Sequence, residues 1–137
     1  MKKVERQVEV LLESLIEVAN IQKVIESLPR GYISVKVISG HTYYYRQWRE
    51  GNKVVSAYVP ESYLNVVKQK IEIRKQNEAL LKILKADYRK AEKQVLKSGY
   101  LTREQIDEVK AKIESLSEEE LEDRRTLVQN LIDQLLD

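Results

Sequence analysis

Tyrosines and basic residues recur at alternate positions between Gly31 and Val59, which gives this segment the chemistry of a binding surface. Tyrosine offers a flat ring on which a nucleic-acid base can stack, and lysine or arginine can bind phosphate oxygens. Catalytic chemistry is not indicated. His41 is the only histidine, there is no cysteine, and the chain has no HExxH motif, glycine-rich phosphate loop or nucleophile elbow. We therefore expect no catalytic residue, no metal site and no cofactor, and we predict that the protein is not an enzyme.

Two turn signals, Ser39-Gly40 and Gly51-Asn52, divide the segment into three runs rich in β-branched and aromatic residues. We predict an antiparallel β-meander with two-residue turns, because such turns fix the register of the strands that they join. The opposed residues are then Ile38 and His41, Val37 and Thr42, Glu50 and Lys53, and Trp48 and Val55.

Since side chains alternate between the two faces of a strand, this register sorts them into two sets. The aliphatic face is expected to pack against a core; it contains Ile33, Val35, Val37, Thr42, Tyr44, Arg46, Trp48, Val55, Ala57 and Val59. The opposite side, called the tyrosine face below, contains Tyr32, Ser34, Lys36, Ile38, Tyr43, Tyr45, Gln47, Arg49, Val54, Ser56 and Tyr58.

The tyrosine face is the candidate nucleic-acid interface. Its rings, cations and short hydrogen-bonding groups suit a phosphate backbone with nearby bases. The alternative is that a helix covers this face, and a register slip of one residue would exchange the two faces. The predicted contact residues are Tyr32, Ser34, Lys36, Tyr43, Tyr45, Gln47, Arg49, Lys53, Ser56 and Tyr58.

Helical patterns surround the predicted sheet. An amphipathic helix runs from the amino end to Leu28, where Pro29 ends it, and a second helix begins after Pro60 and extends to Ser98. Capping boxes then predict two further helix starts, at Thr102 with Gln105 and at Ser117 with Glu120.

The predicted fold class is α+β, with a small three-stranded antiparallel β-meander flanked by long amphipathic helices and a helical hairpin or bundle at the carboxyl-terminal end. The segments are an amino-terminal amphipathic helix (1–28), the β-meander (29–60), a long basic helix (61–98) and an acidic helical hairpin (99–137). Their net charges are −1, +4, +5 and −6. The basic middle favours binding of a polyanion, although a basic helix packed on an acidic one would give the same totals.

The amino end alternates charged and apolar residues, so we expect neither a signal peptide nor a membrane span. The absence of cysteine agrees with a cytoplasmic location. Long amphipathic helices beside a small sheet also suggest a homodimer formed through the helices.

The pattern GYIS…YYYRQWREGNKVVSAYV resembles a family of short, uncharacterised bacterial proteins that is common in Firmicutes and mobile elements. The shared motif reads approximately GxIS followed by YYYxx[YW]REGxKVxSxYV, and the resemblance covers residues 29 to about 75. It implies no established activity. The matching residues are Gly31, Ile33, Ser34, Tyr43, Tyr44, Tyr45, Trp48, Arg49, Glu50, Gly51, Lys53, Val54, Ser56, Tyr58 and Val59.

The order of three strands and a helix is also similar to the arm-site DNA-binding domain of tyrosine recombinases. In that family the exposed face of the sheet enters the major groove. This resemblance implies contact roles for Lys36, Tyr43, Tyr45, Gln47, Arg49 and Ser56. The chain departs from the family because no recombinase catalytic region follows and because its sheet is less basic.

Three functions are compatible with these patterns. The first is a nucleic-acid-binding protein, with DNA more favoured than RNA. The second is a phage- or mobile-element-encoded inhibitor of the anti-defence or anti-CRISPR type, or an adaptor, which binds a host protein through the same face or an acidic tail. That tail contains Glu118, Glu119, Glu120, Glu122 and Asp123. The third is a structural dimer in which the tyrosine face is buried.

Overall fold

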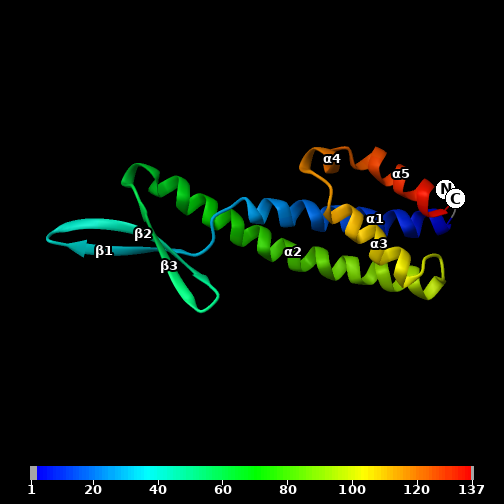
Figure 1. Cartoon of the computed structure of the whole chain (residues 1–137), viewed down its shortest axis with the longest axis horizontal. Helices are drawn as coiled ribbons and strands as arrows, with labels where there is room; N and C mark the ends of the chain where they lie inside the picture. The colour runs from blue at the N-terminus through cyan, green and yellow to red at the C-terminus, as the bar shows by residue number, and fades with distance from the viewer. Residues whose placement is uncertain (1–2, 137) are drawn as a thin grey trace. The chain divides into compact units, whose positions relative to one another are not determined.

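The computed structural model describes residues 3–136 and has the expected α+β fold (Figure 1). In chain order its elements are α1 (Lys3–Glu26), β1 (Tyr32–Ile38), β2 (His41–Glu50), β3 (Lys53–Val59), the 3-10 turn η1 (Glu61–Tyr63), α2 (Leu64–Ser98), α3 (Arg103–Glu114), α4 (Glu118–Glu122) and α5 (Arg124–Leu136). The chain forms two compact units. The sheet unit is Val24–Glu78, and the helical unit comprises the residues up to Lys23 and those from Ala79 onward.

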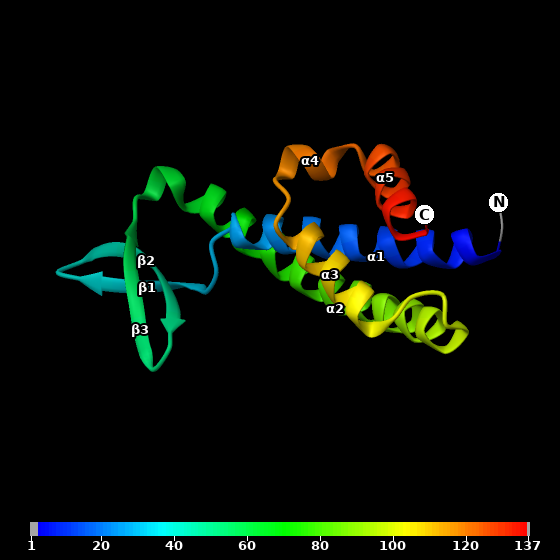
Figure 2. The ribbon, with the colours of Figure 1, turned by 45° about the vertical axis from the view of Figure 1, so that its right-hand side comes forward.

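The three strands form one antiparallel sheet in the order β1-β2-β3, with the predicted register. Ile38 pairs with His41 and Glu50 pairs with Lys53, so both turns have two residues as expected. Positive φ at both Ser39 (51°) and Gly40 (80°) is typical of a type I′ turn, whose twist matches that of the strands. Figure 2 shows β1 and β3 running at an angle to each other, as expected for a twisted sheet.

Gly31 determines how the chain enters the sheet. Its φ is +103°, and a Cβ atom at this position would lie 1.9 Å from the carbonyl oxygen of Gln47. Gln47 is the residue that pairs with Tyr32, the first residue of β1. An L side chain at position 31 would therefore push the start of β1 away from β2.

The helical unit contains the main hydrophobic core. Its buried residues come from the predicted helical stripes, and Figures 1 and 2 both show α3 beside α1 and α2. Completely burying one leucine or isoleucine side chain contributes about 2 kcal/mol, so this core holds the bundle together. Among the described residues, the largest completely buried side chains all lie here: Val8, Leu11, Leu12, Ile16, Val95, Ile106, Ile113 and Leu121.

Both predicted capping boxes are formed. The Gln105 amide donates to Thr102 Oγ1 at 3.2 Å, and the Thr102 amide donates to Gln105 Oε1 at 2.9 Å. The box at Ser117 has the same two reciprocal bonds with Glu120. However, the single helix expected after Ser117 is divided into two helices, α4 and α5. Asp123 separates them, because its carboxylate accepts a hydrogen bond from the Thr126 amide at 3.2 Å and so starts a new helix.

Within residues 3–136, none of the helices is both long enough and apolar enough to cross a bilayer.

Candidate nucleic-acid interface

The register places nine of the ten predicted contact residues on the tyrosine face. Lys53 lies on the other face, because it pairs with Glu50 and is two residues from Val55. Tyr32 and Tyr58 are 55% and 58% exposed. Lys36, Arg49 and Ser56 are also exposed, whereas Ser34, Tyr43, Tyr45 and Gln47 are partly buried. The exposure of these five side chains shows that nothing within the sheet unit covers them.

Side-chain contacts hold the tyrosine face in a defined arrangement. The Tyr32 hydroxyl donates to Gln47 Oε1 at 2.8 Å, and Lys36 Nζ lies 4.7 Å from the centre of the Tyr45 ring. The rings of Tyr45 and Tyr58 meet edge to face at 5.9 Å, with an angle of 66° between their planes. Each contact joins two residues of the same face, which agrees with the register. The rings are thus ordered before any partner binds, which lowers the entropy cost of binding.

The tyrosine face carries positive charge without a compensating carboxylate. Lys36 and Arg49 are its two cations, and neither forms an ion pair with another residue of 3–136. Glu50 is the one acidic residue in the three strands, and it lies on the opposite face. There it accepts a hydrogen bond from Trp48 Nε1 at 2.9 Å and lies 3.9 Å from Arg30. An anion would therefore meet no repulsive partner on the tyrosine face.

One end of the tyrosine face is hollowed. The hollow has a volume of about 540 Å³ and is lined by Tyr32, Gln47, Arg49 and Val54 of this face together with Arg30, Gly31 and Trp48 at its edge. This concave space thus has an exposed ring, an amide, a guanidinium and an aliphatic side chain around it. The polar groups among them could orient a bound ligand.

The expectation that the aliphatic face packs against a core is only partly correct. Val59 is 5% exposed, but Val35 and Val37 are 58% and 69% exposed. The sheet unit contains only the last residues of α1 and the first 15 residues of α2 as regular helix. A helix rises only about 1.5 Å per residue, so this length of helix covers one end of the sheet and not the whole of it. The middle strand alone has ten residues.

Arg46 is the basic residue on the aliphatic face, and the structure gives it a packing role. Its guanidinium lies 3.7 Å from the centre of the Trp48 ring and donates to the Arg30 carbonyl at 2.8 Å. Burial lowers the pKa of Arg46, and the nearby charges of Arg30 and Arg74 lower it further. Arg46 therefore packs on the Trp48 ring within β2 and attaches the Arg30 backbone to the sheet.

Arg74 is a structural residue that the sequence patterns missed. Its guanidinium donates to the carbonyls of Ile25 at 2.9 Å and Leu28 at 2.6 Å, and so satisfies acceptors at the carboxyl end of α1. The spacing of Arg74 in the sequence is the signal that could have identified this role. Arg74 follows Ile71 by three residues and so occupies the apolar stripe of its helix.

Among the described residues, no group of three or more histidine, cysteine, aspartate or glutamate side chains is placed to hold a metal ion. The absence of catalytic activity stays a prediction.

Comparisons with known proteins add one finding. The family model described as "Domain of unknown function (DUF6788)" matches residues 1–69, which include the whole sheet. No curated protein and no solved structure matches the chain.

Proposed function

This chain belongs to the family of that domain of unknown function (DUF6788), whose description names no activity, so we propose a function from the geometry of the sheet. In this proposal the tyrosine face binds nucleic acid, and duplex DNA is the favoured partner. The observation that carries this proposal is an ordered aromatic surface with two exposed cations and no carboxylate. The resemblance of the sheet to recombinase arm-site domains supports the same partner.

The spacing of the two cations favours a duplex. Lys36 pairs with Tyr43, and Arg49 follows Tyr43 by six residues on β2. At about 3.4 Å per residue, the two cations stand roughly 20 Å apart along the sheet. The major groove is about 12 Å wide, so side chains at this separation can reach phosphates on both of its edges. The tyrosines between them would then face the bases.

The binding energy would come mainly from phosphate contacts. Each phosphate neutralised by lysine or arginine releases condensed counterions, which makes the affinity depend on salt with a slope of about −0.9 per contact. Lys36 and Arg49 should each supply one such contact. Tyr32 and Tyr58 add stacking or groove contacts, which contribute on the order of 1 kcal/mol per ring.

Fluorescence anisotropy with a labelled 20-base-pair duplex between 50 and 200 mM NaCl tests this proposal. Lys36→Ala and Arg49→Ala should each weaken binding and reduce the magnitude of the slope of log K against log salt by about 0.9. Lys53→Ala is the matched control, because it removes the same charge from the opposite face of the same sheet. Failure to bind any duplex or single strand at 50 mM NaCl would refute the proposal, as would an equal effect of Lys53→Ala.

Protein binding is the second candidate, and a separate observation favours it. Val35 and Val37 are more than half exposed on the aliphatic face of β1, and Ile38 is more than half exposed on the tyrosine face at the same end of the strand. Exposed aliphatic side chains that lie close together are typical of protein interfaces. In the alternative of an inhibitor or adaptor, this end of β1 and the neighbouring tyrosines would contact a host protein. Purification of the protein with one stoichiometric partner that resists nuclease would favour this function over the first.

A further inference from the structure

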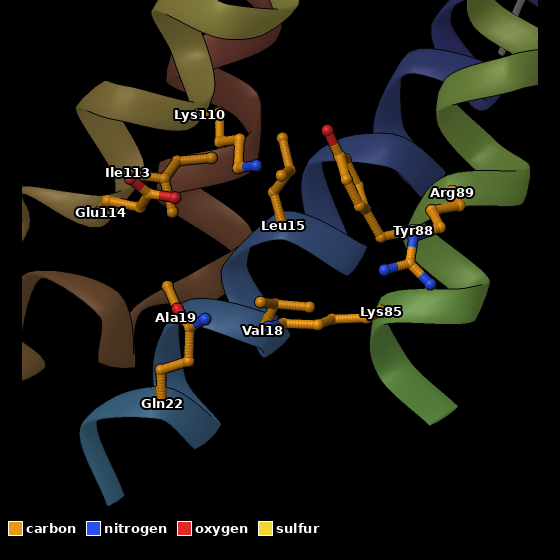
Figure 3. Close-up of a pocket in the computed structure, with 10 residues that line it drawn as sticks. All are labelled: Leu15, Val18, Ala19, Gln22, Lys85, Tyr88, Arg89, Lys110, Ile113 and Glu114. Atoms are coloured by element: carbon orange, nitrogen blue, oxygen red, sulfur yellow. The ribbon is translucent and has the colours of Figure 1, made fainter. Parts of the chain in front are cut away.

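The helical unit contains a pocket that has no part in the proposed interface. It has a volume of about 210 Å³ and lies among residues of α1, α2 and α3 (Figure 3). Its apolar side is formed by Leu15, Val18 and Ala19 of α1 together with Ile113 of α3. Three of these four belong to the buried core, so the floor of the pocket is part of the rigid bundle.

The other side of the pocket is positively charged. Lys85 and Arg89 come from α2 and Lys110 comes from α3, and Glu114 is the one acidic residue that lines the pocket. None of the three cations forms an ion pair with a described residue. The pocket therefore has an excess of two positive charges beside an apolar floor.

Tyr88 and its neighbours explain why a nearby acid does not neutralise these cations. Lys110 Nζ lies 5.4 Å from the centre of the Tyr88 ring, which also lines the pocket. Glu92 is engaged elsewhere, because it pairs with Arg103 at 2.6 Å. Burial opposes ionisation of Glu92, but hydrogen bonds with Tyr88 and Arg103 outweigh this effect and lower the pKa of the carboxyl group. Glu92 thus stays ionised and paired with Arg103, and it forms no ion pair with Lys85, Arg89 or Lys110, although the charge of Lys110 also lowers the pKa of its carboxyl group.

We infer that this pocket binds a small molecule with an apolar ring and one anionic group, either a carboxylate or a phosphate monoester. The ring would lie against Leu15, Ala19 and Ile113, and the anion would bind Lys85, Arg89 or Lys110. A cavity of about 150 Å³ can bind benzene, so a volume of about 210 Å³ fits a single substituted ring. This site is independent of nucleic-acid binding by the sheet.

Titration of the full chain, followed by amide NMR, tests the inference with four probes. Phenyl phosphate and benzoate carry both features, and the difference between their affinities identifies the preferred anion. Benzyl alcohol lacks the charge, and inorganic phosphate lacks the ring. At least one of the first two should give saturable shifts at Leu15, Ala19 and Ile113, at concentrations where the last two give none. The inference is overturned if neither anionic probe saturates, or if benzyl alcohol or inorganic phosphate binds as tightly.

Variants locate the site. Lys85→Gln and Lys110→Gln should each weaken the better anionic probe about tenfold, the loss expected for one hydrogen bond to a charged group. Lys93→Gln is the matched control, because it makes the same change on the exposed surface of α2 outside the pocket. Far-UV circular dichroism should show that all three variants keep their helix content, since glutamine and lysine have similar helix propensities. Equal weakening by Lys93→Gln, or none by Lys85→Gln and Lys110→Gln, would overturn the inference.

Discussion

Replacing Gly31 with alanine tests whether the sheet is held in the register that creates the tyrosine face. At φ +103° an L residue is strained, which costs about 1 to 2 kcal/mol. The new Cβ atom would also lie 1.9 Å from the Gln47 carbonyl oxygen, and this oxygen belongs to the backbone, so a side-chain rotation cannot remove the clash. Backbone shifts that relieve such overpacking cost about 1 to 3 kcal/mol. Gly31→Ala should therefore destabilise the sheet unit by about 3 kcal/mol in total.

Gly51→Ala is the matched control. Gly51 has φ +61°, but a Cβ atom there meets nothing within 4 Å. Its replacement should cost only the conformational strain, about 1 kcal/mol. The difference of about 2 kcal/mol between the two variants measures the clash with Gln47.

The fluorescence of Trp48 is the appropriate signal for urea unfolding of the full-length variants. Trp48 is the only tryptophan and lies in β2, so its emission reports the sheet unit separately from the helical unit. The slope of the free energy against urea should stay unchanged, since both variants alter stability rather than the area exposed. If Gly31→Ala and Gly51→Ala lower the midpoint equally, the entry of β1 described above is wrong.

Two further predictions concern charged side chains. Arg74→Ala should destabilise the sheet unit by about 2 kcal/mol in the same urea assay, because it leaves the carbonyls of Ile25 and Leu28 without a charged donor. Lys75→Ala, at an exposed position, should change the stability by less than about 0.5 kcal/mol. The pKa of Glu13 is raised above 4.5 by burial, by the charge of Glu9 and by a hydrogen bond with Glu9. The stability that protonated Glu13 contributes is therefore complete below pH 4.5 and is lost as the pH rises through the raised pKa. Glu13→Gln should therefore have a higher thermal midpoint than the wild type at pH 7 and the same midpoint at pH 3.5; a lower midpoint at pH 7 would contradict this reasoning.

The sheet could be predicted from the sequence because its determinants are local. Ser39-Gly40 and Gly51-Asn52 fix two tight turns, and the register and the membership of each face follow from them. The capping boxes at Thr102 and Ser117 are likewise local and were predicted at the correct residues. The single helix expected after Ser117 was wrong, since the spacing of apolar residues continues across Asp123 although the backbone does not.

Contacts between residues distant in sequence could not be predicted in this way. Arg74 binds carbonyls more than 45 residues away, and only its place in an apolar stripe hints at a special role. The exposure of Val35 and Val37 depends on how much helix covers the sheet, which the alternation of side chains does not reveal. The cations of the pocket come from α2 and α3, and its apolar floor comes from α1 and α3. In the sequence each of these cations looks like an ordinary solvated lysine or arginine.

The most direct test of the proposed interface is an aromatic NMR titration of the protein with duplex DNA. The ring signals of Tyr32, Tyr45 and Tyr58 should shift in a saturable way at low salt. The ring of Tyr44, on the opposite face of the same strand as Tyr45, should keep its position and serves as the internal control. Shifts of Tyr44 and Trp48 with the other three rings unchanged would mean that DNA contacts the aliphatic face, and the proposed interface would be wrong.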